Sequence, residues 1–424
     1  MEKIKIKDID LDIYHKELSN GLQVYFIPYK YKNNYYMSFG TKYGSMIRDF
    51  GIEKDKIKSY PLGIAHFLEH KMFETDDGND PFTFYNSSGT DANANTNYKL
   101  TQYVCYGNNN IKKNLEFLLN YVSTPYFTDK NVEKEKGIIA QEIEMYDDDP
   151  EWIIDEEIKK AMFWYHPIRD DIAGTVEEIK KITKEDLYDC HNTFYNPANM
   201  MLFVSGKLNI KELEEVVDKY DKKHPKKYIE IYLPDYKEPQ EVYQKAIEKE
   251  ASVMIPKIAY GIKINSNNLS IEDPIKRFMY LNMYLNIKFG LTSKFRENMR
   301  KKDLMTSLFV EASIIDNFYT LTLYAETNDK KQFIKELEKE LKTNDIAEED
   351  INRLKKVWIA SEVYTSDSIE MTVNNTIYDI INFGRIIDDK VDIIKHLNKE
   401  ELDEIVSEID FNNNSYVYLK PKNK

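Results

Sequence analysis

The feature that most constrains the fold is a series of strand and helix signals that occurs twice, once on each side of a proline-rich segment. Residues 224–240 hold three prolines, mixed charge and little apolar periodicity, as linkers do. With 424 residues, the chain is long enough for two domains. We therefore expect a first domain at 1–223, a linker at 224–240 and a second domain of similar organisation at 241–424.

Each half mixes strands and helices without the regular alternation of β-α-β units. In the first half, strand patterns cover 21–30, 34–46, 91–107 and 199–208, and helical patterns cover 63–74, 111–125, 129–146, 151–163 and 209–224. In the second half, strands are expected at 253–264 and 415–422, a hairpin at 308–327, and helices at 270–300, 330–342, 347–365 and 368–384. This arrangement is typical of the α+β class, with antiparallel-rich sheets flanked by helices.

The composition excludes several classes of partner. A net charge of −14 argues against nucleic acid, because binding to phosphates needs a basic surface. No run of ~18 apolar residues is present, so no membrane-spanning helix is expected. The charged N-terminal residues 1–18 lack the apolar core of a secretion signal, so we expect a cytoplasmic protein. The two cysteines are too few for a disulfide framework, and we interpret them as buried apolar residues.

The most informative motif is HFLEH at residues 66–70, within the predicted helix 63–74. Residues i and i+4 lie on one helical face, so His66 and His70 can bind one metal ion. Glu69 lies on the same face and can reach a water molecule at that ion, in the inverted order of the H-E-x-x-H motif. The alternative is a surface helix with two unrelated histidines, which would need no apolar flanks and no further acidic partner.

A catalytic zinc site uses three protein ligands and keeps one position for water, so a third ligand is required. Glu135 and Glu142, in the predicted helix 129–146, are seven residues apart and therefore share a helical face. Isoleucines between and beside them indicate that this helix is partly buried, where a carboxylate needs a partner. Alternatively, both are solvated charges of an ordinary acidic–basic helix. Two histidines and one carboxylate suit Zn²⁺ best.

Several segments together resemble the pitrilysin/insulysin family of inverzincin metallopeptidases, in the bacterial branch of small subunits similar to mitochondrial processing peptidase. HFLEH, the Glu-x6-Glu pair and the following MYDDDPEW carry the resemblance. Further similar segments are GTDANANTNYKLTQY, HPIRDDIAGTVEEI and FYNPANMMLFVSG. The resemblance covers most of residues 20–210 and is weak in the second half.

The resemblance implies a zinc-dependent endopeptidase that hydrolyses unfolded or short peptides. It also implies two similar α+β domains that form half of a clamshell, whose two halves enclose a chamber for peptides. The implied roles are zinc ligation by His66, His70 and Glu142, general-base catalysis by Glu69, support of the catalytic site by Glu135, and substrate binding by Asn93 and Ala94.

The second half departs from the family pattern. Relatives use an arginine and a tyrosine there, in a stretch of the form Arg-x-x-x-Gly-Leu-x-Tyr. Residues 294–309 offer Arg296 and Arg300, but Thr306 stands in the place of the tyrosine. We retain Arg300 as a candidate substrate-binding residue; the alternative is that both arginines are solvated helix charges. The departure predicts a dimer with a paralogous subunit that bears the arginine and tyrosine.

Two other functions stay open. One is a specialised protease that matures a particular peptide. The other is a non-catalytic peptide-binding subunit of a heteromeric peptidase, in which loss of the motif residues would be expected. The remaining histidines near the motif region, His166 and His191, are interpreted as structural.

Overall fold

The computed structural model describes residues 1–29, 33–76, 78, 80–225 and 229–422, which form two compact units. The first unit comprises Met1–Ile143, Asp170–Asp235 and Val363–Asp389. The second unit comprises Glu144–Arg169, Tyr236–Glu362 and Lys390–Lys424. Of the predicted linker 224–240, residues 226–228 lie outside the described residues. No helix in the described part of the chain is both long and apolar enough to cross a membrane.

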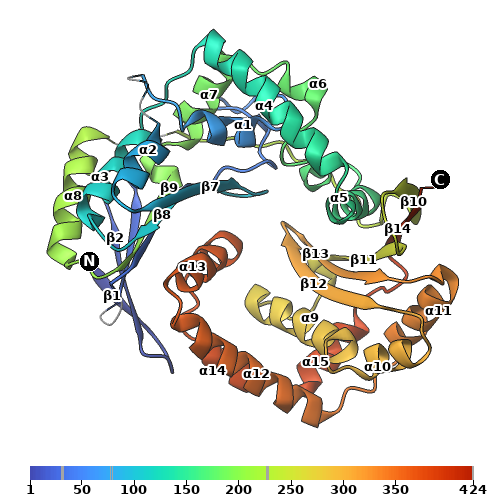
Figure 1. The fold of residues 1–424 in the computed structure, drawn as a ribbon. Helices are drawn as coiled ribbons and strands as arrows, with labels where there is room; N and C mark the ends of the chain where they lie inside the picture. The colour runs from blue at the N-terminus through green and yellow to red at the C-terminus, as the bar shows by residue number, and fades with distance from the viewer. Residues whose placement is uncertain (30–32, 77, 79, 226–228, 423–424) are drawn as a thin grey trace. The chain divides into compact units, whose positions relative to one another are not determined.

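The first unit contains a seven-stranded sheet in the order β1-β2-β3-β9-β4-β8-β7. Figure 1 labels β1, β2, β7, β8 and β9 of this sheet. Its strands are β1 (Glu2–Ile6), β2 (Leu11–Glu17), β3 (Gln23–Pro28), β4 (Tyr35–Thr41), β7 (Asp91–Thr96), β8 (Thr101–Gly107) and β9 (Met200–Gly206). Neighbours are antiparallel except β3 and β9, which run parallel. β7 is an edge strand, because β8 is its only partner among the described strands. A separate two-stranded sheet joins β5 (Asp49–Phe50) and β6 (Lys58–Ser59).

Helices cover both faces of this sheet. The helices of this unit are α1 (Ile64–Lys71), α2 (Pro81–Ser87), α3 (Ile111–Val122), most of α4 (Asp129–Asp147), α6 (Val176–Ile179), α7 (Lys184–Phe194), α8 (Ile210–Lys223) and α13 (Ile369–Phe383). Alternation along β3 separates two cores: Val24 and Phe26 join the larger core with α1, α3, α7 and α8. Tyr25 and Ile27 face the other core, which α13 completes. α13 contributes an apolar stripe at helical spacing: Ile369, Val373, Ile377 and Ile380.

The second unit contains a five-stranded sheet in the order β10-β14-β11-β13-β12. Its strands are β10 (Ala246–Ala251), β11 (Lys257–Asn265), β12 (Ser307–Ile315), β13 (Phe318–Glu326) and β14 (Asn414–Pro421). Its helices are α5 (Pro150–Met162), α9 (Pro274–Phe289), α10 (Lys294–Lys301), α11 (Lys330–Leu341), most of α12 (Glu348–Ser366), α14 (Lys390–His396) and α15 (Lys399–Ser407). Short 3₁₀ turns occur at Pro167–Arg169, Pro197–Asn199 and Ser266–Asn268.

The two sheets share one topology. The order β3-β9-β4-β8-β7 in the first unit corresponds strand for strand to β10-β14-β11-β13-β12 in the second. In both sheets, the strand that comes first along the chain pairs in parallel with the strand that comes last: β3 with β9, and β10 with β14. Every other pair is antiparallel. The predicted α+β class with two similar domains is therefore confirmed, and the internal duplication is a duplication of topology.

Two helices, however, pack outside their own half of the sequence. α5 follows α4 along the chain but packs against β11 and β14 of the second unit. α13 follows α12 but packs against β4 and β9, the equivalent strands of the first unit (Figure 1). A side chain at Gly261 of β11 would place its Cβ 2.6 Å from Met162 Sδ, so this glycine lets α5 approach closely. The compact units thus differ from the contiguous division 1–223 and 241–424 at these two helices.

A buried ion pair holds the end of α5 in the second unit. Lys263 on β11 is fully buried, and its Nζ lies 2.5 Å from an oxygen of Glu238. The Glu238 carboxylate also accepts hydrogen bonds from the backbone N–H groups of residues 164–166, at 2.8–3.0 Å. Glu238 was assigned to the predicted linker, and the structure shows that this end of the segment is tightly anchored.

Removing Glu238 should therefore destabilise the protein strongly. We expect Glu238→Ala to lower the free energy of unfolding by about 3–5 kcal/mol, because it leaves the ammonium of Lys263 buried without its counter-charge. Urea unfolding, monitored by circular dichroism, measures the change. Glu241→Ala is a matched control, since the Glu241 side chain is exposed. Equal stability of the two variants would contradict the prediction.

Candidate metal centre

Two glycines determine where α1 begins. Gly63 caps its N-terminus with φ of 82°, a value that favours glycine. A Cβ at Gly63 would lie 2.2 Å from the carbonyl oxygen of Ala173, and a Cβ at Gly174 would lie 2.5 Å from that of Leu62. The two backbone segments can therefore touch only because both positions lack side chains. This close approach seats the start of α1 against residues 171–174.

The apolar face of α1 leaves its histidines directed away from the core. Phe67 and Leu68 are completely buried in the larger core of the first unit. His66 and His70 lie one helical turn apart, with their ring centroids 4.6 Å from each other. The predicted helix at 63–74 and its histidine pair are thus present, and packing of the intervening residues fixes the orientation of the pair.

Glu142 of α4 meets both histidines. Its Oε1 lies 3.8 Å from His66 Nε2, and its Oε2 lies 3.5 Å from His70 Nε2. One ligand atom from each of the three residues lies within 4.8 Å of the others, and no other group of three His, Cys, Asp or Glu in the described ranges is so arranged. Bonds of about 2.0–2.1 Å to a tetrahedral zinc ion would separate two ligand atoms by roughly 3.4 Å. The three side chains therefore fit a zinc ion.

Glu135 orients the second histidine. Its Oε1 lies 3.1 Å from His70 Nδ1, so that nitrogen can donate a hydrogen bond and Nε2 is left to a metal. Burial opposes the charged imidazole, but the hydrogen bond to Glu135 and nearby carboxylates raise the pKa of His70. Burial likewise opposes ionisation of Glu135, yet His70 and Lys71 hold the pKa of this carboxyl below its usual range. The arrangement is a carboxylate–histidine pair of the kind that supports metal ligands.

His66 is held neutral. Burial, together with the neighbouring His70, lowers the pKa of His66 to about 3. Its Nδ1 is buried and has no hydrogen-bond partner among the described residues. A neutral imidazole is the form that binds a metal, and a buried ring with one unpaired nitrogen gains from a strong partner at the other.

Glu69 occupies a place suited to a base. It is 7% exposed, and one oxygen accepts a hydrogen bond of 2.7 Å from Thr96 Oγ1. Burial raises the pKa of Glu69, while the bond from Thr96 opposes this shift. Thr96 is the last residue of β7, and the sequence analysis did not single it out. A carboxylate with a raised pKa accepts and returns a proton more readily near neutral pH.

The two candidate substrate-binding residues of the first unit lie on its edge strand. Asn93 is exposed and Ala94 is half-buried on β7, against which α1 packs. The side-chain oxygen of Asn93 accepts a hydrogen bond of 2.9 Å from the Ala94 N–H. Both residues therefore stand on a strand that ends the sheet among the described strands, beside the helix that carries the histidines.

The arginines of 294–309 belong to the second unit and differ in their surroundings. Arg296 is buried and donates to the backbone carbonyl oxygens of Leu308 at 2.6 Å and Phe289 at 3.3 Å, which is a structural role. Arg300 is exposed on α10, so its assignment to substrate binding stays a prediction. Thr306 donates to Glu326 at 2.8 Å.

Two further histidines of the first half, His166 and His191, have structural partners. His166 accepts a hydrogen bond from the Ile168 N–H at Nδ1, and its Nε2 lies 3.1 Å from Asp316. His191 Nε2 lies 3.2 Å from the carbonyl oxygen of Val122.

The two cysteines, Cys105 and Cys190, are both buried. Burial raises the pKa of the Cys105 thiol to about 12, so this thiol is unreactive.

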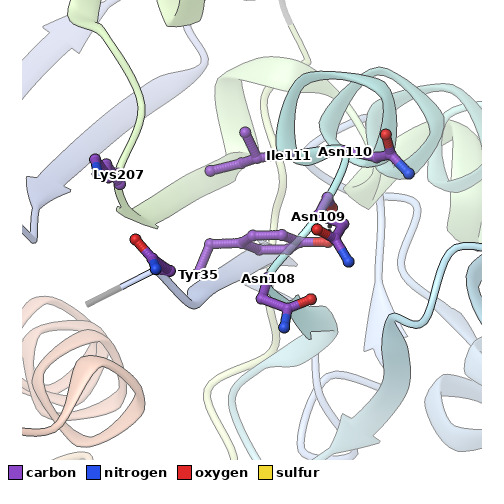
Figure 2. A pocket seen from close by; sticks show the side chains of 7 residues that line it. Tyr35, Asn108, Asn109, Asn110, Ile111 and Lys207 are labelled. Carbon is purple, nitrogen blue, oxygen red and sulfur yellow. Dashed lines mark hydrogen bonds between the residues drawn. The ribbon is translucent and has the colours of Figure 1, made fainter.

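A cavity of about 320 Å³ lies elsewhere in the first unit, between the start of β4 and the start of α3 (Figure 2). It is lined by Asn33, Tyr35, Asn108, Asn109, Asn110, Ile111 and Lys207. None of the metal-centre residues lines this cavity.

The bond between Glu135 and His70 leads to a quantitative prediction. Glu135→Gln should lower zinc affinity by about 10–100-fold, because the supporting carboxylate increases the basicity of the ligand and fixes its ring. Competition with a chromophoric chelator measures the affinity. Glu133→Gln, on the exposed side of α4, is the control. An unchanged affinity in Glu135→Gln would show that His70 does not depend on this carboxylate.

Comparisons with known proteins agree with the grouping of His66, His70 and Glu142 as a candidate metal centre. Residues 57–176 match the family described as Insulinase (Peptidase family M16), and residues 181–357 match Peptidase M16 inactive domain. The chain is 40% identical over 311 residues to a Bacillus subtilis protein described as "Uncharacterized zinc protease YmfH", covering 73% of this chain and 72% of the relative.

Two solved structures share the fold. A putative M16-like peptidase from Alicyclobacillus acidocaldarius superposes with a TM-score of 0.91 at 28% identity, covering 98% of this chain and 100% of the other. Pitrilysin superposes with a TM-score of 0.77 at 17% identity, covering 100% of this chain and 47% of the pitrilysin chain. The second likeness is one of fold alone.

Proposed function

Since this chain belongs to the insulinase family of peptidases, family M16, we propose that it is a zinc-dependent endopeptidase that hydrolyses unfolded or short peptides. The observation that carries the proposal is the convergence of His66, His70 and Glu142, with the buried carboxylate of Glu69 on the same helix as the histidines. A non-catalytic subunit would have no need of this set. The match of 181–357 to the inactive domain of the family agrees with a single metal centre in the described residues.

Each residue has a distinct chemical task. His66, His70 and Glu142 would hold the zinc ion, which supplies a Lewis acid that activates water and polarises the scissile carbonyl. Glu69 takes a proton from the attacking water and later delivers it to the leaving amine. Glu135 keeps the His70 ring in place through its Nδ1, and the Thr96 hydroxyl orients the Glu69 carboxylate.

The substrate would bind as an additional strand. Among the described strands β7 pairs on one side only, and those of its residues whose backbone N–H and C=O groups face the other side can offer them to an extended peptide. Asn93 and Ala94 lie on this strand and would contact the substrate backbone. Binding of this kind recognises an extended shape more than a particular sequence, so only peptides without a stable fold fit.

A partner subunit is part of the proposal. The second unit lacks the tyrosine of the family pattern, where Thr306 stands. The Arg296 guanidinium donates its hydrogen bonds to the backbone carbonyl oxygens of Phe289 and Leu308. The fold of this chain matches 47% of the pitrilysin chain, about half of its length. We infer that the chain pairs with a paralogous subunit that supplies the arginine and tyrosine, with Arg300 the remaining candidate on this chain. A protease dedicated to maturing one peptide is the second candidate.

The test is cleavage of an internally quenched peptide library by the purified, zinc-loaded chain. We expect cleavage that stops on addition of a chelator and returns with zinc, either for the chain alone or after addition of its partner. Cleavage by the chain alone would refute the need for a partner. Absence of cleavage in both preparations, with zinc bound, would refute the endopeptidase proposal in favour of the non-catalytic subunit.

A further inference from the structure

Lys71, the residue after His70, is buried although it is a lysine at the end of a short helix. Its side chain has no exposed surface. Burial of an ammonium costs several kcal/mol unless it is paired and hydrogen-bonded. The structure provides three acceptors around Nζ: Glu74 Oε1 at 2.8 Å, the Asn131 carbonyl oxygen at 3.2 Å and Glu135 Oε2 at 3.6 Å. The first two oxygens lie at hydrogen-bond distance from the ammonium, and Glu135 Oε2 lies at ion-pair distance.

Two of the three oxygens around Lys71 Nζ connect this residue to the metal centre through α4. Asn131 and Glu135 both lie on α4, the helix that also carries Glu142. Glu135 divides its two oxygens between neighbours in the sequence, with Oε1 at His70 Nδ1 and Oε2 toward Lys71 Nζ. The ammonium therefore contacts the same carboxylate that orients a proposed zinc ligand.

We propose that Lys71 is a positioning residue of the metal centre. Its ammonium fixes the Glu135 carboxylate, which in turn orients His70. This inference rests on the proposed zinc site. A lysine that only tied two helices together would affect the stability of the protein without affecting the zinc affinity of the folded state. A positioning residue is expected to change the zinc affinity of the folded protein.

The experiment is a double-mutant cycle read out as zinc affinity. The full chain is compared as parent, Lys71→Met, Glu135→Gln and the double variant, by competition with a chromophoric chelator below the unfolding temperature of each. We expect Lys71→Met and Glu135→Gln each to weaken zinc binding by about 10–100-fold. The double variant should bind zinc within about threefold of Glu135→Gln, because Lys71 acts through that carboxylate.

Two results would overturn the proposal. One is parental zinc affinity in folded Lys71→Met, and the other is a double variant in which the two losses multiply. If Lys71→Met does not fold, Lys71→Gln replaces it with the same thresholds, since its amide can still donate to the Asn131 carbonyl. Lys136→Met is the control, because Lys136 pairs with Glu133 and not with Glu135. Failure of the parent to bind zinc would instead refute the proposed function.

Discussion

Glu69→Gln is expected to leave zinc bound while lowering kcat for peptide hydrolysis by about 10²–10⁴-fold. Gln has nearly the same shape as Glu and can still accept the hydrogen bond from Thr96, so the helix and its histidines should keep their positions. It cannot take a proton from water at neutral pH. The measurement pairs the zinc content with kcat on a quenched peptide, in whichever preparation cleaves it, the chain alone or with its partner.

The control for this experiment is Glu133→Gln, an exposed carboxylate of α4. It should retain parental kcat and parental zinc content. If Glu69→Gln turned over peptide as fast as the control, Glu69 would not be the base, and the chemical tasks assigned to α1 would be wrong. If it lost zinc, its role would lie in supporting the metal instead.

Glu142→Gln is expected to lose zinc together with activity. Glu142 faces both histidine Nε2 atoms, and a neutral amide oxygen is a much weaker ligand than a carboxylate. The fall in zinc affinity should therefore exceed the roughly 10–100-fold that loss of a supporting residue causes. Chelator competition and metal analysis of the dialysed protein measure it.

Glu144→Gln tests the specificity of that effect, because Glu144 is exposed and lies only two residues away on α4. It should keep parental zinc affinity. If Glu142→Gln kept full zinc occupancy while Glu135→Gln lost zinc, Glu135 would be the zinc ligand and Glu142 the supporting carboxylate.

The histidine pair of the metal centre could be predicted from sequence, since it depends on helical spacing alone. The i, i+4 relation places His66 and His70 together on any helix, and the apolar Phe67 and Leu68 between them indicate which face is buried. Spacing could not distinguish Glu135 from Glu142, because both lie on the same face of α4. The difference arises only from how α4 lies across α1, which brings one carboxylate to Nδ1 and the other to Nε2.

Other features depend on tertiary packing or on single side chains. The pattern of residues 91–107 predicts one strand, but the region forms β7 and β8. The Asn97 side chain accepts hydrogen bonds from the Lys99 and Leu100 N–H groups and makes a turn between the two strands. β1 and β2 were not predicted, because their sequences are rich in charged residues; β1 is an edge strand of the sheet and β2 is its neighbour. Helical periodicity predicted α5 and α13, but periodicity does not say which sheet a helix covers.

The central claim is that His66, His70 and Glu142 together hold a zinc ion, and anomalous diffraction at the zinc edge from crystals of the zinc-loaded chain tests it most directly. We expect one anomalous peak about 2.0–2.2 Å from the Nε2 atoms of both histidines and from a carboxylate oxygen of Glu142. A peak bound by other residues, or no peak at these three side chains in zinc-loaded crystals, would contradict the account.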